Sequence, residues 1–130
     1  MRLEFAISEM GVGGAERVVV DLARDAVGRG DKMLLLGAPG HNDQDLAGTG
    51  VRRVALPTAR SPLEVARAVG RTARATRGFG PDLIHAHNVK VTAIARLGSR
   101  LAGIRRAPLL ATYHGVPHEE VDAAARILRL

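Results

Sequence analysis

The stretch MGVGGAERVVVDLA, from Met10 to Ala23, gives the clearest indication of the fold. It places three glycines within four positions, Gly11, Gly13 and Gly14, directly before a run with the apolar spacing of an amphipathic helix. A short apolar run, Leu3–Ile7, comes just before it. Strand, glycine-rich loop and helix in this order often hold a phosphate, because the unpaired N–H groups at a helix N-terminus attract anions. We therefore expect either a ligand or a tightly packed turn against the backbone of this loop.

The rest of the chain alternates between short apolar runs and helical periods. The apolar runs, bounded by glycine or proline and short enough to be strands, are Leu3–Ile7, Met33–Leu36, Val51–Leu56, Leu83–Ala86 and Leu109–Thr112. Four helices are predicted. The first ends near Gly28 or Gly30, and the second extends over Pro62–Arg77 with Ser61 as its N-cap. The third extends over Val91–Ala102, and the fourth begins near His118 or Glu119. Most of the runs are continuously apolar, which predicts strands buried on both faces. The predicted fold class is therefore α/β, a doubly wound, Rossmann-like parallel sheet.

Length, composition and charge exclude several classes of protein. A chain of 130 residues is long enough for one domain with a buried core. It has no cysteine, which excludes disulfides, thiolate metal sites and a cysteine nucleophile. The first apolar run is interrupted by Glu4 and is too short for a signal-peptide core or a membrane span, which predicts a cytoplasmic protein. The net charge of +6 comes from seventeen arginines and two lysines, but only Phe5, Phe79 and Tyr113 are aromatic, so nucleic acid is not an expected partner.

Three unusual stretches are expected to meet at one end of the sheet. Right-handed crossovers between five parallel strands predict the spatial order 3-2-1-4-5, in which the winding reverses beside the first strand. Ligands of open α/β sheets bind at this point, beyond the carboxyl ends of the strands. Here those ends carry Gly11–Gly14, HAHN (His85–Asn88) and TYHG (Thr112–Gly115). The crevice between these stretches is the predicted site.

The glycine loop does not match an established nucleotide-binding fingerprint. A dinucleotide-binding loop needs its third glycine where this chain has Glu16, and no Walker lysine follows the loop. Glu16 also opposes the binding of a bare phosphate, because the carboxylate repels it. Alternatively, the glycines serve only a tight turn and close packing of the helix. Both interpretations are open from the loop alone.

Histidines supply the chemistry at the other two strand ends. His85 and His87 share one face of their strand, and a third histidine, His114 or His118, would complete a metal site. No cysteine or aspartate stands with them at an established metal spacing, so we expect no metal and favour hydrogen bonds to a ligand or to the backbone. We expect His85 to pack, His87 to face the site, and His114 to project into the crevice as the strongest candidate. The stretch HEEVD has Asp122 where a metalloprotease has its second histidine, and the chain contains no nucleophile elbow.

A stripe of arginines marks the second predicted helix. Arg67, Arg71 and Arg74 fall on one side of Pro62–Arg77, opposite a weak apolar face. Such a surface suits the headgroups of anionic lipids. An ordinary solvated face of an arginine-rich protein gives the same pattern. The sequence therefore leaves two questions open: whether an anionic membrane surface is a partner, and whether the protein lies peripherally on the inner face of the membrane.

Taken together, three motifs resemble the N-terminal domain of glycosyltransferase family 4, the retaining GT-B enzymes that use nucleotide-activated sugars. The motifs are GGAERVVVDLA after the first strand, PDLIHAHN at the fourth and LLATYHG at the fifth, and they extend over essentially the whole chain. In this family two Rossmann-like domains face a cleft, and the N-terminal one mainly holds the acceptor. The resemblance implies that residues 1–130 form the acceptor-side domain of a hexosyltransferase-type enzyme. Its implied partners are a nucleotide-diphosphate sugar, as co-substrate rather than cofactor, and a lipid, glycan or small-molecule acceptor.

The resemblance also assigns roles to single residues. His114 matches the catalytic histidine near the transferred sugar. Gly13 and Gly14 match the loop that approaches the donor diphosphate or the acceptor, and His87 and Asn88 match positions that line the acceptor side. The expected substrate-binding residues are Gly13, Gly14, His87, Asn88, Tyr113 and Gly115.

One part of the family pattern is missing. The family's paired glutamates, eight positions apart in the C-terminal domain, have no counterpart, since Ile127 and Leu128 stand eight residues after Glu119 and Glu120. The final stretch, EEVDAAARILRL, has the pattern of a helix with no following strand. We therefore expect a truncated chain that lacks the donor-binding domain and is inactive alone. The alternative function is a stand-alone nucleotide- or phosphate-binding regulatory module, which would need the glycine loop but not His114.

Overall fold

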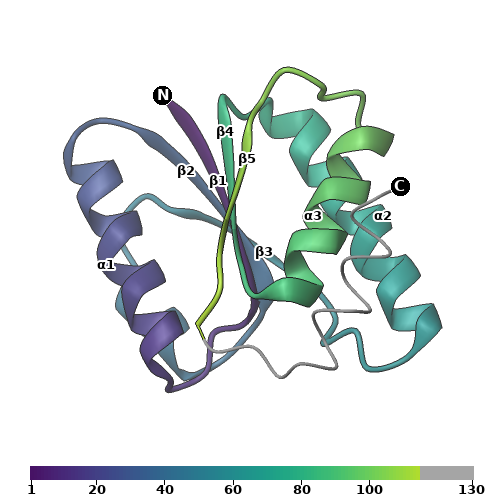
Figure 1. The fold of residues 1–130 in the computed structure, drawn as a ribbon. Helices are drawn as coiled ribbons and strands as arrows, with labels where there is room; N and C mark the ends of the chain where they lie inside the picture. The colour runs from purple at the N-terminus through teal and green to yellow at the C-terminus, as the bar shows by residue number, and fades with distance from the viewer. Residues whose placement is uncertain (115–130) are drawn as a thin grey trace.

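A computed structural model describes residues 1–114, which form five strands, three α-helices and one 3-10 helix (Figure 1). The elements follow in the order β1 (Arg2–Glu9), α1 (Gly14–Gly28), β2 (Lys32–Ala38), η1 (His41–Leu46), β3 (Arg52–Ala55), α2 (Pro62–Phe79), β4 (Leu83–His87), α3 (Val89–Leu101) and β5 (Leu109–Thr112). All neighbouring strands are parallel, and they lie in the order β3-β2-β1-β4-β5. The predicted doubly wound α/β sheet and its strand order are confirmed. The helix expected near His118 or Glu119 lies outside the described residues.

Helices cover the sheet on both faces. On one face, Val19 and Val20 of α1 pack against Phe5 in a buried core. On the opposite face, Phe79 of α2 joins Leu36 and buried residues of α3 in a second core. Figure 1 shows α1 on one side of the sheet and α2 with α3 on the other. Right-handed connections require this arrangement, because the chain winds from β1 toward β3 and then back toward β5. None of the helices within residues 1–114 has the length and apolarity needed to cross a membrane.

The ends of α2 follow local rules that the sequence carries. Ser61 Oγ accepts the backbone N–H of Glu64 (3.2 Å), and the Glu64 carboxylate accepts the backbone N–H of Ser61 (3.1 Å), which together form a capping box. Pro62 occupies the first turn. Gly80 ends the helix in the left-handed conformation, with a φ of 65°. The predicted N-cap is confirmed, and the helix continues to Phe79.

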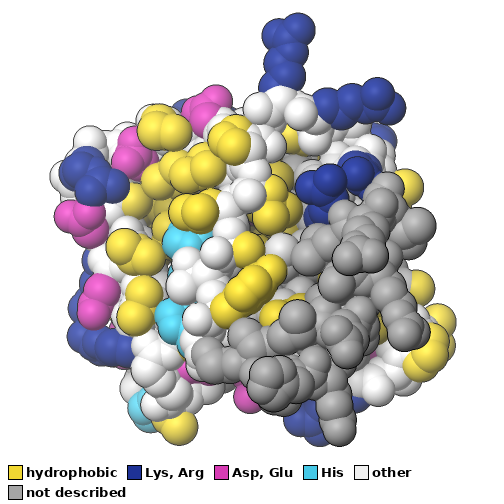
Figure 2. Space-filling model, in the orientation of Figure 1, with side chains coloured by type: hydrophobic (Ala, Val, Ile, Leu, Met, Phe, Trp, Pro, Cys, Tyr) yellow, Lys and Arg dark blue, Asp and Glu magenta, His cyan; other side chains and the backbone are white. Residues whose placement is uncertain are grey.

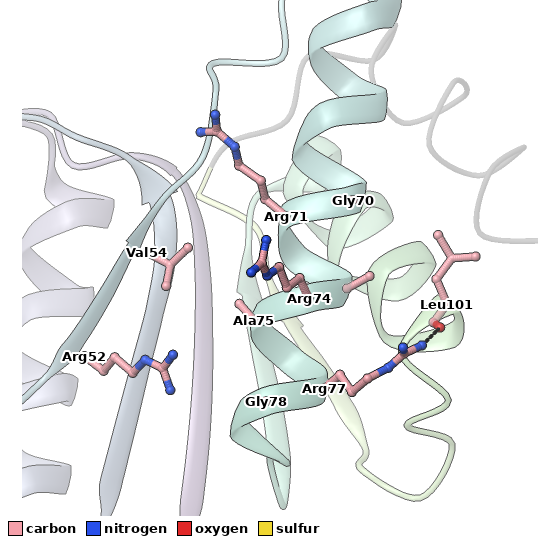
Figure 3. Close-up of a pocket in the computed structure, with 10 residues that line it drawn as sticks. Arg52, Val54, Gly70, Arg71, Arg74, Ala75, Arg77, Gly78 and Leu101 are labelled. Atoms are coloured by element: carbon pink, nitrogen blue, oxygen red, sulfur yellow. Dashed lines mark hydrogen bonds between the residues drawn. The ribbon is translucent and has the colours of Figure 1, made fainter.

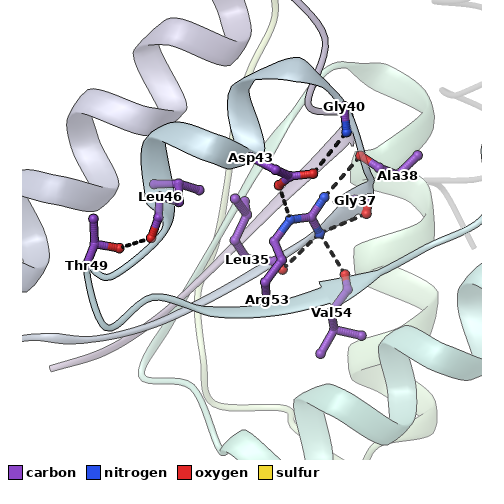
Figure 4. A network of polar contacts seen from close by, with 9 residues as sticks. All are labelled: Leu35, Gly37, Ala38, Gly40, Asp43, Leu46, Thr49, Arg53 and Val54. Atoms are coloured by element: carbon purple, nitrogen blue, oxygen red, sulfur yellow. Dashed lines mark hydrogen bonds and ion pairs between the residues drawn. The ribbon is translucent and has the colours of Figure 1, made fainter.

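The segment between β2 and β3 is tied to the sheet by Arg53 (Figure 4). Its guanidinium donates to the carboxylate of Asp43 (2.7 Å) and to the carbonyls of Gly37 (2.8 Å) and Ala38 (3.0 Å). Asp43 also accepts the backbone N–H of Gly40 (2.9 Å). These charge-assisted contacts hold η1 at the carboxyl end of β2.

A carboxylic acid lies in the middle of the first strand. Glu4 is fully buried, and the hydroxyl of Thr76 on α2 donates to its Oε1 (2.9 Å). Its Oε2 has no hydrogen-bond partner among the described residues. Burial raises the pKa of Glu4 to about 7, and the hydrogen bond from Thr76 opposes this shift with a smaller effect. The glutamate that interrupts the first apolar run is therefore a core residue.

Candidate functional site

The carboxyl ends of β1, β4 and β5 lie side by side. Ile7 pairs with His87, and His87 pairs with Thr112. The glycine loop follows β1, and His114 lies just beyond the end of β5. The structure therefore brings the three sequence motifs to one end of the sheet, where open α/β sheets bind their ligands. Gly115, an expected substrate-binding residue, lies outside the described residues.

The glycine loop is exposed at the start of α1. Gly13 and Gly14 are both exposed, and Gly13 caps the helix without a side-chain hydrogen bond. A Cβ at Gly14 would meet no other atom, whereas a Cβ at Gly13 would collide with the carboxylate of Glu16. Glu16 thus folds back over the loop, and its charge occupies the place where the positive end of the helix dipole would hold an anion. In this arrangement the loop suits a hydroxyl donor better than a bare phosphate.

A second segment supports the glycine loop, and sequence reasoning did not predict it. The buried side chain of Asn42 in η1 donates from Nδ2 to the carbonyl of Gly11 (2.6 Å). The backbone N–H of Asn42 donates to the carbonyl of Met10 (2.9 Å). Gly40 packs so closely on that carbonyl that a Cβ would not fit. The signal in the sequence was HNDQD, residues 41–45, a cluster of turn-forming side chains between two predicted strands.

Three histidines stack at the ends of β4 and β5. The ring centroids of His85 and His87 are 4.2 Å apart, and those of His87 and His114 are 5.5 Å apart at an interplanar angle of 17°. Nε2 of His85 lies 2.8 Å from the hydroxyl of Thr112, and Phe5 packs edge-on against His85 at 5.2 Å between centroids. Figure 2 shows histidine side chains between hydrophobic ones on one face of the molecule, with most Lys and Arg toward the edges. The stack therefore connects the core at Phe5 with the exposed ring of His114.

Burial favours the neutral form of the two inner rings. His87 has no exposed surface, and burial, followed by the nearby His85 and His114, lowers its pKa to about 4. Burial also lowers the pKa of His85, with a smaller contribution from His114. A neutral imidazole donates from one nitrogen and accepts at the other. Each contact in the stack therefore requires a defined tautomer.

The structure separates the predicted site histidines by exposure. From the sequence we expect His85 to pack and His87 to face the site, but both are buried and His87 is the more deeply buried of the two. His87 meets the exposed ring of His114, with its Nδ1 3.2 Å from Nε2 of His114. Direct binding of a substrate by His87 stays a prediction. Residues 1–114 contain no cluster of side chains that could hold a metal ion.

Asn88 joins the end of β4 to α3 in a conformation that few residues adopt. Its φ is 82°, in the region that favours glycine. Its backbone N–H donates to the carbonyl of Thr112 (2.9 Å), and its carbonyl accepts the hydroxyl of Thr92 (2.7 Å). Strain of this kind is often retained beside binding sites. Asn88 and the exposed Tyr113 stay candidates for substrate binding.

A groove of about 790 Å³ lies between β3 and α2 (Figure 3). Its arginines are Arg52, Arg71, Arg74 and Arg77. Figure 3 shows Arg52 and Arg74 directed into the space between strand and helix, whereas Arg77 turns toward α3 and donates to the carbonyl of Leu101 (2.9 Å). Within residues 1–114, none of the four forms an ion pair. The structure thus gathers a different set from the predicted stripe, because Arg67 does not line the groove.

The fold and the site together define a class of protein. A parallel sheet wound in both directions, with a glycine loop at its switch point, has the Rossmann-like architecture. The family model of Glycosyltransferase Family 4 matches residues 12–129, and the chain belongs to this family.

Two solved structures share the fold. A glycosyltransferase from Rickettsia africae ESF-5 is 16% identical with a TM-score of 0.71, over 98% of this chain and 35% of that one. MurG from Acinetobacter baumannii is 16% identical with a TM-score of 0.72, over 98% of this chain and 39% of that one. The chain thus spans less than two fifths of the length of either protein. A comparison with curated protein sequences finds no significant match.

Proposed function

We propose that the chain is the N-terminal, acceptor-side domain of a retaining glycosyltransferase of carbohydrate biosynthesis in the cytoplasm. The parent enzyme moves a sugar from a nucleotide-diphosphate sugar to a lipid, glycan or small-molecule acceptor. The observation that carries the proposal is that the exposed glycine loop after β1 and the exposed His114 after β5 lie at the same end of the sheet, in a chain of Glycosyltransferase Family 4. The nucleotide sugar is a co-substrate, and the reaction needs no metal or organic cofactor.

Each group at the site has a place in this reaction. His114 hydrogen-bonds an oxygen of the sugar phosphate that is being cleaved, where charge develops in the transition state. The backbone N–H groups of Gly13 and Gly14 face the donor or the acceptor at the helix N-terminus. The carboxylate of Glu16, which lies over the loop, accepts hydrogen bonds from sugar hydroxyls.

The proposal includes a second domain. This chain covers only 35% and 39% of the two solved proteins that it resembles. We expect the parent protein to contain a further Rossmann-like domain with two glutamates eight positions apart, and residues 1–130 alone to be inactive. The nucleotide sequence of the parent gene beyond the codon for Leu130 tests this expectation. A stop codon directly after Leu130 would contradict it.

An activity assay of the parent protein tests the reaction. The protein is incubated with a panel of nucleotide-diphosphate sugars and acceptors, and the anomeric configuration of each product is determined by NMR. We expect transfer with retention. Inversion would refute the proposed mechanism. Nucleotide binding by the chain alone, without transfer by the parent, would instead favour a regulatory module.

We also propose that the arginine groove contacts an anionic membrane surface at the inner face of the membrane. The support is a set of exposed arginines without ion pairs among residues 1–114, over a floor that includes Val54 and Ala73. Guanidinium groups attract the phosphates of lipid headgroups, and salt screens this attraction. Cosedimentation should favour phosphatidylglycerol vesicles over phosphatidylcholine vesicles and weaken as salt rises. Equal binding to both vesicle types at low salt would leave the groove as solvated surface.

A further inference from the structure

The geometry points to His87 as a positioning residue: it donates a hydrogen bond from Nδ1 to Nε2 of His114 and so holds His114 in the tautomer that carries its proton on Nδ1. The catalytic use of this tautomer rests on the function proposed above. The tautomer itself follows from the contacts of His87 and can be measured without any substrate.

The contact joins a buried ring to an exposed one. Nδ1 of His87 lies 3.2 Å from Nε2 of His114, at the long end of the hydrogen-bonding range. In a hydrogen bond between two imidazole nitrogens, one nitrogen must carry the proton and the other a lone pair. Two arrangements are therefore possible: either His87 donates, or His114 does.

The other nitrogen of His87 decides between these arrangements. Nε2 of His87 is buried and has no hydrogen-bond partner among residues 1–114. If His114 donated, a neutral His87 would carry its proton on Nε2, and a buried N–H would be left without an acceptor. Among backbone groups, buried N–H donors without a partner are rarer than buried carbonyl acceptors without one, and the same preference applied to the imidazole of His87 favours the proton on Nδ1. His87 therefore carries its proton on Nδ1.

A second proton on His87 is excluded by its surroundings. The ring packs against the rings of Phe5 and His85, at 5.8 Å and 4.2 Å between centroids, and His114 is its third aromatic neighbour. No carboxylate of the described chain forms an ion pair with it. Burial lowers the pKa of His87 to about 4, so the ring is neutral near pH 7. A neutral ring has one N–H, and that N–H points to His114.

The consequence is a defined donor on the exposed histidine. Because Nε2 of His114 accepts the bond, a neutral His114 carries its proton on Nδ1. An N–H donor suits an oxygen that gains negative charge, such as one on a departing diphosphate. Without His87, an exposed His114 would exchange between two tautomers, and only a fraction of the molecules would present this donor.

Nitrogen-15 NMR of the histidine-labelled chain tests the tautomer directly. Long-range proton–nitrogen correlations, recorded where exposed imidazoles are neutral, distinguish a protonated ring nitrogen from an unprotonated one. We expect a protonated Nδ1 and an unprotonated Nε2 in both His87 and His114. The opposite assignment for either ring overturns the inference, and the wild-type spectrum decides this even where a variant fails to fold.

Three variants separate positioning from structural support. His87→Leu removes the donor and should convert His114 to the tautomer mixture of an exposed histidine. His87→Asn keeps an N–H donor near the same place and should restore the Nδ1–H form. His85→Leu is the matched control, since His85 is also buried in β4 but contacts Thr112, and it should leave the tautomer of His114 unchanged. An unchanged tautomer in folded His87→Leu contradicts the inference.

Activity of the parent protein separates this inference from the proposed function. His87→Leu should lower kcat by about tenfold with little change in KM, and His87→Asn should recover most of the loss. A tautomer that changes as expected without any change in transfer would confirm the positioning and refute the role proposed for His114. A parent protein that transfers no sugar would refute the function and leave the tautomer result intact.

Discussion

The molecule carries two polar surfaces whose side chains are held in different ways. At the carboxyl ends of β4 and β5, stacked rings connect buried His87 with exposed His114. In the groove between β3 and α2, four arginines line an apolar floor, and all four are exposed. At the first surface, the buried ring of His87 holds the exposed ring of His114 in place. In the groove, the long charged side chains lie in solvent.

This difference predicts two kinds of binding. A hydrogen-bonding group held by a buried partner discriminates between ligands, and it loses much of its value when that partner is removed. Exposed guanidinium groups attract anions over a distance, and salt screens them with a Debye length of about 8 Å at physiological ionic strength. We therefore expect the histidine surface to respond to single substitutions and to pH, and the arginine groove to respond to ionic strength.

The largest expected effect is on turnover at the histidine surface. In the parent protein, His114→Ala should lower kcat by roughly ten- to a thousand-fold, because it removes one positioned polar group. The melting temperature should fall only modestly, since the side chain is exposed and water can replace it as the acceptor for the Nδ1–H of His87. The matched control is His85→Ala, which should lose more stability because the ring contacts Phe5 and Thr112. Sugar transfer and thermal unfolding of both variants are measured in parallel, and the reverse pattern would exchange the two roles.

The next effect is a pH dependence of stability that comes from His87. The fold lowers its pKa from 6.5 to about 4, so the unfolded chain binds this proton more readily. The stability linked to His87 is therefore complete above pH 6.5 and is lost as the pH falls toward 4, by at most roughly 3 kcal/mol. Urea unfolding across this range should show the slope in the wild type and lose most of it in His87→Asn.

The buried Glu4 titrates in an overlapping pH range, and its titration changes the stability in the opposite direction. The fold raises the pKa of Glu4 from 4.5 to about 7, so the stability linked to Glu4 is present below pH 4.5 and is lost as the pH rises through 7. To separate the two titrations, the pH dependence is also measured for Glu4→Gln and for the double variant Glu4→Gln, His87→Asn. A slope that survives His87→Asn in both backgrounds would assign the titration to another group.

A smaller effect is expected where η1 supports the glycine loop. Asn42→Ala removes the donor to the carbonyl of Gly11 and should reduce the free energy of unfolding by about 1 to 3 kcal/mol, because it leaves that acceptor unpaired. The control is Gln44→Ala in the same helix, whose exposed side chain should contribute less than about 0.5 kcal/mol. Chemical denaturation measures both variants. Equal stability of the two would show that the backbone contacts alone hold the loop.

The smallest effect on stability is expected in the arginine groove. Arg74→Gln should change the free energy of unfolding by less than about 0.5 kcal/mol, because the side chain is exposed. At low salt it should weaken binding to anionic vesicles by about fivefold, which corresponds to about 1 kcal/mol per basic residue at a membrane surface. Arg67→Gln is the matched control, since Arg67 lies on the same helix outside the groove. Equal losses in both variants would favour the stripe predicted from the sequence over the groove.

Local patterns in the sequence determined the elements and their order. The glycine loop after an apolar run and the N-cap at Ser61 depend on neighbouring residues, so spacing along the chain predicts them. The strand order followed as well, because right-handed crossovers leave few alternatives for five parallel strands. The position of His114 and the glycine loop at one end of the sheet follows from that order alone.

The contacts between side chains follow from the tertiary structure and not from the sequence pattern. The sequence places His85 and His87 on one face of the same strand, but it does not give their contacts: His85 contacts Thr112 and His87 contacts His114. Asn42 supports Gly11, which lies 31 positions away in the sequence. Arg71 and Arg74 of α2 line a groove only because β3 places Arg52 opposite them. The physical reason is that hydrophobic periodicity reports the face on which a residue lies, whereas a hydrogen bond depends on distances between segments that the sequence places far apart.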